Sequence, residues 1–346
     1  MPTTPNWAEA AREGSYVAAG FAFANGQRAD IKLHYRTLGQ PTKGSDGGIN
    51  NAVLALHGST GSGKQFLQPS FADHLFGPGQ PLDVSRYFII LPDAIGHGGS
   101  SKPSDGLRVA FPRYGYTDIL EGQHRLLTDA LGVRHLRLVL GTSMGGMLTW
   151  LWGQRHPGIM DALMPIASLP EPVSGRNLLW RRLLIAAIRG DPAYQDGNYS
   201  RQPGNLGIAW NVFKLMADSP EHLAKALTRH EDADRHVAET AGEALRQEDA
   251  NDVIWEFAAS EDYHPAEDLS KITAPLLAVN FVDDAINPAE LGGLERAIKQ
   301  VKNGRSVTFP VGPASKGHQT LSAAEVWKNS LHELLAQTTP GATARI

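Results

Sequence analysis

Short apolar runs recur along the chain and alternate with longer segments in which apolar residues follow a helical period. Such runs, bounded by glycine, proline or aspartate, are typical of buried strands, and helices between them are typical of a parallel sheet covered on both faces. Ahead of this series, two segments of strand composition flank Asn25-Gly26, a common hairpin turn. The pattern predicts an α/β fold with a mostly parallel sheet of eight strands, at residues 16–24, 30–38, 51–56, 87–91, 136–140, 162–166, 275–281 and 306–310.

The pattern changes between Ser168 and Leu269, where apolar residues recur at helical spacing and no segment has the composition of a strand. An insertion of this kind between two core strands is expected to form a helical cap over the carboxyl ends of the strands. We therefore predict an α/β core at residues 16–168 and 270–338, and a cap or lid at residues 169–269.

Composition and charge narrow the classes of function. The net charge of −4 shows no basic excess, so nucleic acid is not an expected partner. The chain has no cysteine, which excludes thiol catalysis and cysteine-based zinc sites. The spacing of His230 and His236 matches no standard set of metal ligands, and we expect neither a metal nor a cofactor.

Two features bear on location. No apolar run approaches the roughly 18–20 residues that span a bilayer, so a membrane is not an expected partner. The segment Met1–Ser15 lacks the charged start and apolar core of a signal peptide. We predict a cytoplasmic protein, or a periplasmic or secreted one if a signal peptide has been removed.

The strongest chemical signal is the pentapeptide Gly141-Thr142-Ser143-Met144-Gly145. It follows an apolar run and precedes an amphipathic one, a strand–turn–helix context that holds a serine hydroxyl exposed at a strained apex. The flanking glycines suit a turn that leaves no room for side chains. We predict that Ser143 is a catalytic nucleophile.

A serine hydroxyl needs a base within hydrogen-bonding distance and an acid to orient that base. His318 lies in the loop after the last predicted strand, whereas the other five histidines after residue 168 fall in predicted helices or at their edges. The acid is expected after the penultimate strand, where Asp283 and Asp284 are both candidates. The usual spacing puts a proline four residues after the acid, and Pro288 therefore favours Asp284.

Stabilisation of the tetrahedral intermediate needs two backbone N–H donors. One is Met144, which follows the nucleophile, and the other is expected in the loop that begins His57-Gly58-Ser59. We assign Ser59, with Thr60 as the alternative. The same loop partly matches a phosphate-binding motif, but Gln65 stands where that motif needs a Ser or Thr hydroxyl. His97 precedes the nucleophile in the chain, and a structural role in a turn is expected for it.

Several segments together resemble the homoserine O-acetyltransferase branch of the α/β-hydrolase superfamily, over about residues 30 to 335. They are Phe76–Asp83 leading into Arg86-Tyr87-Phe88, Ser143–Met147, and the cap segments Ile188–Pro192 and Gly197–Tyr199. The resemblance implies the α/β-hydrolase fold with a helical cap and a triad of Ser143, Asp284 and His318. It also implies a homodimer built through cap helices.

Two departures from this family affect the predicted function. An aspartate that follows the catalytic histidine binds the ammonium group of the amino acid in the acetyltransferases, and this chain has Gln319 there. The cap arginine that holds the substrate carboxylate is replaced near Ala209-Trp210, and Pro92–Ser100 resembles the common hydrolase pattern. We therefore predict a serine hydrolase that cleaves a small-molecule carboxylic ester through an acyl-enzyme on Ser143. The alternative is O-acyl transfer from an acyl-CoA donor.

Overall fold

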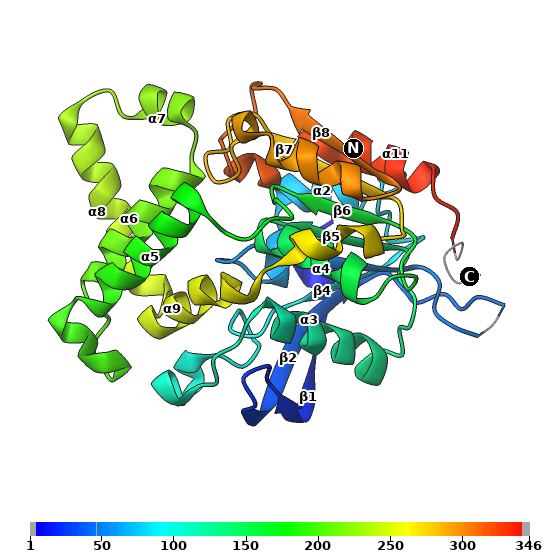
Figure 1. The fold of residues 1–346 in the computed structure, drawn as a ribbon, viewed down its shortest axis with the longest axis horizontal. Helices are drawn as coiled ribbons and strands as arrows, with labels where there is room; N and C mark the ends of the chain where they lie inside the picture. The colour runs from blue at the N-terminus through cyan, green and yellow to red at the C-terminus, as the bar shows by residue number, and fades with distance from the viewer. Residues whose placement is uncertain (1–4, 46, 341–346) are drawn as a thin grey trace.

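The computed structural model describes residues 5–45 and 47–340, and Figure 1 shows a twisted sheet with helices on both faces and a group of helices at one side. The sheet has eight strands in the order β1-β2-β4-β3-β5-β6-β7-β8. Pairs β1–β2 and β2–β4 are antiparallel and all the others are parallel. The predicted α/β fold with a mostly parallel sheet of eight strands is confirmed. The strands are β1 Arg12–Ala22, β2 Arg28–Leu38, β3 Ala52–Leu56, β4 Phe88–Pro92, β5 Leu138–Thr142, β6 Leu163–Ile166, β7 Leu276–Phe281 and β8 Gly304–Phe309.

Most strand positions agree with the sequence pattern, and the largest difference is at the start of β1. This strand begins four residues before the predicted position, because Arg12 already pairs with Thr37 of β2. An edge hairpin that faces solvent contains many polar residues, so the hydrophobic pattern does not show where the strand begins. Backbone pairing therefore extends beyond the predicted start of β1.

Helices cover both faces of the sheet because every residue of a buried strand such as β3 is apolar. Leu54 and Leu56 point to one face, where α3 and α4 pack, and Val53 and Ala55 point to the other, where α2 and α11 pack. The helices are α1 Trp7–Ala10, α2 Pro69–Leu75, α3 Tyr116–Arg125, α4 Met144–Arg155, α5 Gly175–Arg189, α6 Asn205–Ala217, α7 Pro220–Ala226, α8 His230–Gln247, α9 Ala250–Ala258, α10 Gly293–Ala297 and α11 Ala324–Ala336.

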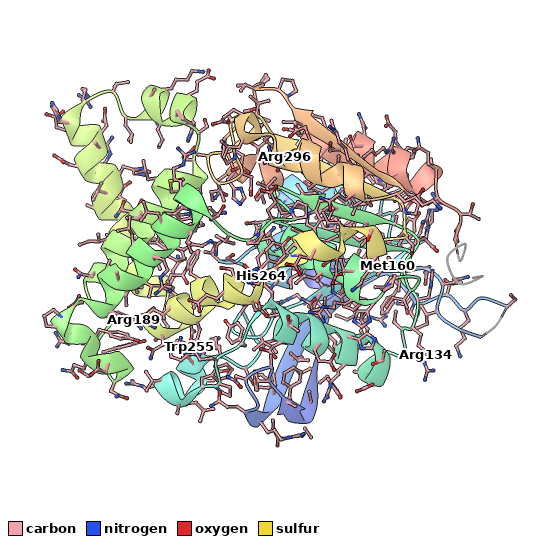
Figure 2. All side chains as sticks on the ribbon, in the orientation of Figure 1. Arg134, Met160, Arg189, Trp255, His264 and Arg296 are labelled. Carbon is pink, nitrogen blue, oxygen red and sulfur yellow. The ribbon has the colours of Figure 1, made fainter. Side chains whose placement is uncertain are left out.

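The described residues between β6 and β7 form helices and turns only, from α5 to α9, and Figure 1 shows these helices to one side of the sheet. We call residues 169–269 the cap. Trp255 of α9, labelled in Figure 2, joins the cap to the core. Its Nε1 donates to the carbonyl oxygens of Phe111 and Pro112 at 3.3 and 3.2 Å, and the Arg113 guanidinium lies 3.4 Å from the centre of its ring. Such contacts hold the cap in a defined place above the core loops.

The turn from β5 into α4 depends on a glycine at position 145. A Cβ there would lie 1.9 Å from the carbonyl oxygen of Leu56, which belongs to the neighbouring strand β3. Helix α4 therefore approaches the sheet more closely than a side chain at position 145 would allow.

We expect Gly145→Ala to destabilise the protein by on the order of 3 kcal/mol, since backbone atoms must shift to admit the methyl group. Gly242→Ala in α8 is the matched control. Only the flexible end of Arg246 is near that position, at 3.2 Å, and replacing a helical glycine stabilises by about 0.5–1 kcal/mol. Urea unfolding of both variants measures the difference, and equal stabilities would contradict the packing argument.

Candidate active site

Ser143 lies at the junction of β5 and α4, with φ of 55° and ψ of −116°. A positive φ is unfavourable for a residue with a side chain and is found mainly where surrounding structure imposes it. Here the Ser143 N–H donates to the carbonyl oxygen of Ile166 at 2.9 Å, and its carbonyl oxygen accepts from Met147. The strained turn directs the Ser143 hydroxyl away from the sheet and out of the helix.

The structure brings Ser143, His318 and Asp284 together in one hydrogen-bonded line. Ser143 Oγ lies 2.8 Å from His318 Nε2, and His318 Nδ1 lies 2.8 Å from Asp284 Oδ2. Asp284 is 1% exposed and His318 is 3% exposed. This geometry lets Nδ1–H donate to the carboxylate while Nε2 accepts the serine proton, as an acyl-transfer triad requires.

The two adjacent aspartates have different surroundings. Asp284 Oδ1 accepts from the backbone N–H groups of Ile286 and Asn287 at 2.8 and 3.0 Å. Burial alone would raise the pKa of Asp284, but the neighbouring His318 and the hydrogen bonds from His318 and Asn287 lower it below its usual value. Asp283 instead accepts from the Gly317 N–H at 2.9 Å and so holds the loop that carries the histidine. The structure thus places Asp284, and not Asp283, against His318.

The two predicted oxyanion donors belong to backbone segments next to Ser143. Met144 is the first residue of α4, and an N–H at that position has no acceptor within the helix. The Gly58 backbone is also close, since a Cβ built on it would lie 3.4 Å from Ser143 Cβ. Ser59 therefore follows a residue that touches the nucleophile, whereas the alternative Thr60 lines a cleft farther along the loop.

His57 orients the peptide that carries the Ser59 N–H. Its Nε2 accepts from the Ala94 N–H at 3.0 Å, so the proton is on Nδ1, which donates to the Gly58 carbonyl oxygen at 2.8 Å. Burial lowers the pKa of His57, which keeps the ring neutral. The C=O and N–H of a trans peptide point in opposite directions, so fixing the Gly58 carbonyl also fixes the Ser59 N–H.

His97 supports the same loop from the other side, in addition to the turn role expected of it. Its Nε2 lies 2.7 Å from the Ser59 carbonyl oxygen and its Nδ1 lies 3.0 Å from that of Ile95. Burial and the adjacent His57 lower the pKa of His97 to about 3. Because both histidines precede the nucleophile in the chain, only the fold reveals that they act on the loop beside it.

A cap arginine that the sequence did not single out lies near this loop. Arg181 of α5 is buried, with Asn177 Oδ1 at 3.0 Å and Ser260 Oγ at 3.4 Å as its hydrogen-bond partners. No carboxylate of the described residues forms an ion pair with it, and burial lowers its pKa while Tyr116 raises it. Burial raises the pKa of Tyr116, and the adjacent Arg181 and Ser59 lower it, so Tyr116 links this arginine to the loop. A buried cation without a counter-ion is costly and points to an anionic or strongly polar ligand group.

The two positions at which the resemblance implies charged residues are uncharged here. Gln319 is half-buried and lines a cleft between the cap and the loop of the histidine. Trp210 is buried against Phe213, with ring centres 5.4 Å apart. Neither residue provides an opposite charge for a zwitterionic amino acid.

Another cleft, of about 720 Å³, runs between α9 and the core loops around Thr60 and Gly98. Its wall carries the carboxylates of Glu248, Asp249, Asp252 and Glu256. Burial and neighbouring carboxylates raise the pKa of Glu248 to about 7 and, against hydrogen bonds from Ser104, that of Asp252 to about 6. The pKa of Glu256 is raised well above its usual value for the same two reasons. We call this the acidic cleft.

The described residues show neither a metal-binding group nor a membrane-spanning helix. No group of three or more histidine and carboxylate side chains is arranged to hold a metal ion. Residues 5–45 and 47–340 also contain no helix that is long and apolar enough to cross a membrane.

Comparison with known proteins places this geometry in a family. The family described as the alpha/beta hydrolase fold matches residues 51–269. A homoserine O-acetyltransferase from Pelobacter propionicus is 28% identical over 327 residues, covering 84% of this chain and 86% of that protein. The solved homoserine O-acetyltransferase from Bacillus anthracis has a TM-score of 0.82 at 18% identity, covering 95% of this chain and 98% of the other. An acetylester hydrolase from Corynebacterium glutamicum has a TM-score of 0.80 at 20% identity, covering 94% and 96%.

A serine on a strand–turn–helix junction above a mostly parallel sheet defines an enzyme of the α/β-hydrolase superfamily. The chain belongs to the alpha/beta hydrolase fold family and lies in its homoserine O-acetyltransferase-like branch.

The unequal surroundings of the two aspartates predict unequal losses of activity. We expect Asp284→Asn to lower kcat by about 10⁴, because an amide at that position favours the wrong tautomer of His318. Asp283→Asn keeps an oxygen acceptor for the Gly317 N–H and is expected to cost far less. Steady-state kinetics with one activated ester compares them, and a larger loss for Asp283→Asn would overturn the assignment.

The raised pKa of Glu248 predicts a stability that depends on pH. The unfolded chain ionises this carboxyl near its ordinary value, but the folded protein keeps it protonated up to about pH 7, so stability falls as the pH rises between these values. Glu248→Gln removes this loss. We expect the variant to have a higher Tm than the wild type at about pH 8 and an equal Tm at about pH 4. Exposed Glu239→Gln in α8 is the control, for which no such crossover is expected.

Proposed function

We propose that this protein hydrolyses carboxylic esters through an acyl-enzyme on Ser143. The observation that carries the proposal is the position of His318, which lies 2.8 Å from both Ser143 Oγ and Asp284 Oδ2. Nε2 takes the serine proton as Oγ attacks the ester carbonyl carbon, and the Ser59 and Met144 N–H groups bind the oxygen that becomes negative. The C–O bond then breaks and the imidazolium protonates the leaving alcohol.

The second half of the cycle uses the same groups with water as the nucleophile. His318 removes a proton from the water as it attacks the acyl carbon, and then returns a proton to Ser143 Oγ as the acid leaves. Asp284 stabilises the imidazolium in both halves. Its lowered pKa keeps it ionised, which this role requires.

Two observations favour water over an amino-acid alcohol as the acceptor. Gln319 and Trp210 bring no charge to the positions that bind ammonium and carboxylate groups in the resembling acetyltransferases. The wide cleft beside the oxyanion loop is acidic, which makes it a poor path for the phosphates of an acyl-CoA.

The second candidate is O-acyl transfer to an alcohol from an acyl-CoA donor. The relative from Pelobacter propionicus is an acetyltransferase, and Arg181 is a buried cation of the cap that lacks a carboxylate partner among the described residues. An acceptor with a carboxylate would satisfy that charge. The two candidates share every step up to the acyl-enzyme, so the triad itself does not separate them.

A product ratio separates the candidates. With an activated acetyl ester as donor and millimolar homoserine present, we expect free acetate to exceed O-acetylhomoserine. Two charge-assisted hydrogen bonds contribute about 1.5–3 kcal/mol each, and without such contacts homoserine competes poorly with water. Mass spectrometry of the products measures the ratio. A predominance of O-acetylhomoserine that is lost in Arg181→Met would establish the transferase. Ser143→Ala, expected to lower kcat on the order of 10⁶-fold, is the control for both reactions.

Two expectations from the sequence stay predictions. One is a cytoplasmic location. The other is a homodimer through the cap, which is supported by apolar side chains that are more than half exposed on α5 and α6: Leu179, Leu183, Ile208 and Leu215.

A further inference from the structure

The acidic cleft reaches close to the nucleophile along two segments of chain. Thr60 and Gly61 line it and directly follow Ser59. Gln65 lines it as well, and its side-chain amide donates to Thr142 Oγ1 at 2.8 Å and accepts from the Gly58 N–H at 3.2 Å. Thr142 precedes Ser143. A substrate bound at Ser143 therefore lies beside two loop segments that also line this cleft.

Charges in the acidic cleft are arranged by depth. Lys64 and Arg246 are exposed, where water and salt screen them. Lys102, which is half-buried, donates to the Gly98 carbonyl oxygen at 2.7 Å and lies 3.8 Å from Asp105. The two buried charged residues of the lining, Asp252 and Glu256, are both acidic, and Glu248 beside them is half-buried, so the inner part of the cleft carries an excess of acidic groups.

The four carboxylates of the cleft differ in what they already bind. Asp249 accepts from the Tyr199 hydroxyl at 2.7 Å and from Gln202 Nε2 at 2.9 Å. Asp252 accepts from the N–H and hydroxyl of Ser104 at 2.8 and 2.5 Å. Both are thus used to join the helices of the cap to each other and to the core.

Glu256 does not join any helices in this way. It is 7% exposed, and neither of its carboxylate oxygens accepts a hydrogen bond from a residue that the structure describes. Its Oε1 lies 3.7 Å from Nε2 of His97, a ring that burial keeps neutral and that therefore supplies no opposite charge. A buried carboxylate that lacks donors costs free energy and is retained where a ligand supplies them.

We propose that the inner acidic cleft binds a primary ammonium group of the substrate, with Glu256 and Glu248 as its partners. This rests on ester hydrolysis at Ser143 and names a substrate class for it, an acyl ester with an amine some distance from the ester bond. The positive charge of the ammonium favours the ionised form of Glu256, whose pKa burial raises in the empty cleft, and the carboxylate then accepts a hydrogen bond from it. The residues that line the cleft include no aromatic side chain, so the site lacks the cage that suits a quaternary ammonium.

The first experiment compares matched esters. ω-Aminoalkyl acetates of graded chain length are paired with n-alkyl acetates of equal length, in which a methyl group replaces the ammonium. Ethyl ω-aminoalkanoates paired with ethyl alkanoates place the amine in the acyl part instead. At the chain length that reaches Glu256, we expect kcat/KM of the amino ester to exceed that of its neutral partner about tenfold.

Substitutions then locate the preference. We expect Glu256→Gln and Glu248→Gln each to reduce this ratio severalfold, whereas Glu239→Gln, in α8 outside the cleft, leaves it unchanged. The ratio remains informative even if Glu256→Gln also slows the neutral ester through His97. A wild-type ratio near one at every chain length overturns the proposal, as does a preference that survives both cleft variants.

A binding measurement keeps this test separate from the hydrolysis proposal. If neither member of any pair is hydrolysed, the proposed function fails, but hexylammonium chloride still tests the cleft by titration calorimetry. We expect the wild type to bind hexylammonium about tenfold more tightly than Glu256→Gln does. Equal affinities would overturn the ammonium site whatever the reaction at Ser143.

Discussion

A hydrogen bond of 2.8 Å joins Ser143 to His318, which lie 175 residues apart in the sequence. The arrangement of strands in the core brings these two residues together. The serine follows β5 and the histidine follows β8, and Asp284 follows β7. In a parallel sheet the carboxyl ends of all strands lie at one edge, so three distant segments meet there. The strained φ of Ser143 and the close approach of α4 at Gly145 then place the hydroxyl within hydrogen-bonding distance of the imidazole.

The loop beside the nucleophile is held as firmly as the triad. His57 and His97 each bind one of its carbonyl oxygens, and both rings are buried and neutral. Asp93 fixes the segments on either side, since it accepts from the N–H groups of Gly63 and Gly99 at 2.7 and 2.8 Å. A rigid loop suits catalysis because donors that are already oriented need no rearrangement when negative charge develops.

Buried charge at the junction of cap and core is distributed unevenly. On one side Arg181 has no carboxylate partner among the described residues, and on the other Glu256 has no hydrogen-bond donor. The cavity that Arg181 lines and the acidic cleft share no lining residue. Polar groups of this kind reduce stability and are found where ligands are bound, so the junction, rather than the triad, is expected to determine which substrates react.

By itself the sequence determined the class of fold, most of the strand positions and the candidate nucleophile, because each of these depends on local order. Short apolar runs must be buried, and a serine between glycines at a strand–helix turn can point in only one direction. The spacing to Pro288 also selected Asp284 over Asp283, and the structure places that residue at His318. Only the tertiary structure decided the rest. Arg181, Glu256 and the two histidines of the oxyanion loop have ordinary sequence contexts, and their burial and missing or shared partners arise from contacts between segments far apart in the chain. Neither a hydrophobic period nor a motif predicts such contacts, because burial and pairing depend on which distant segments the fold brings together and not on neighbouring residues in the sequence.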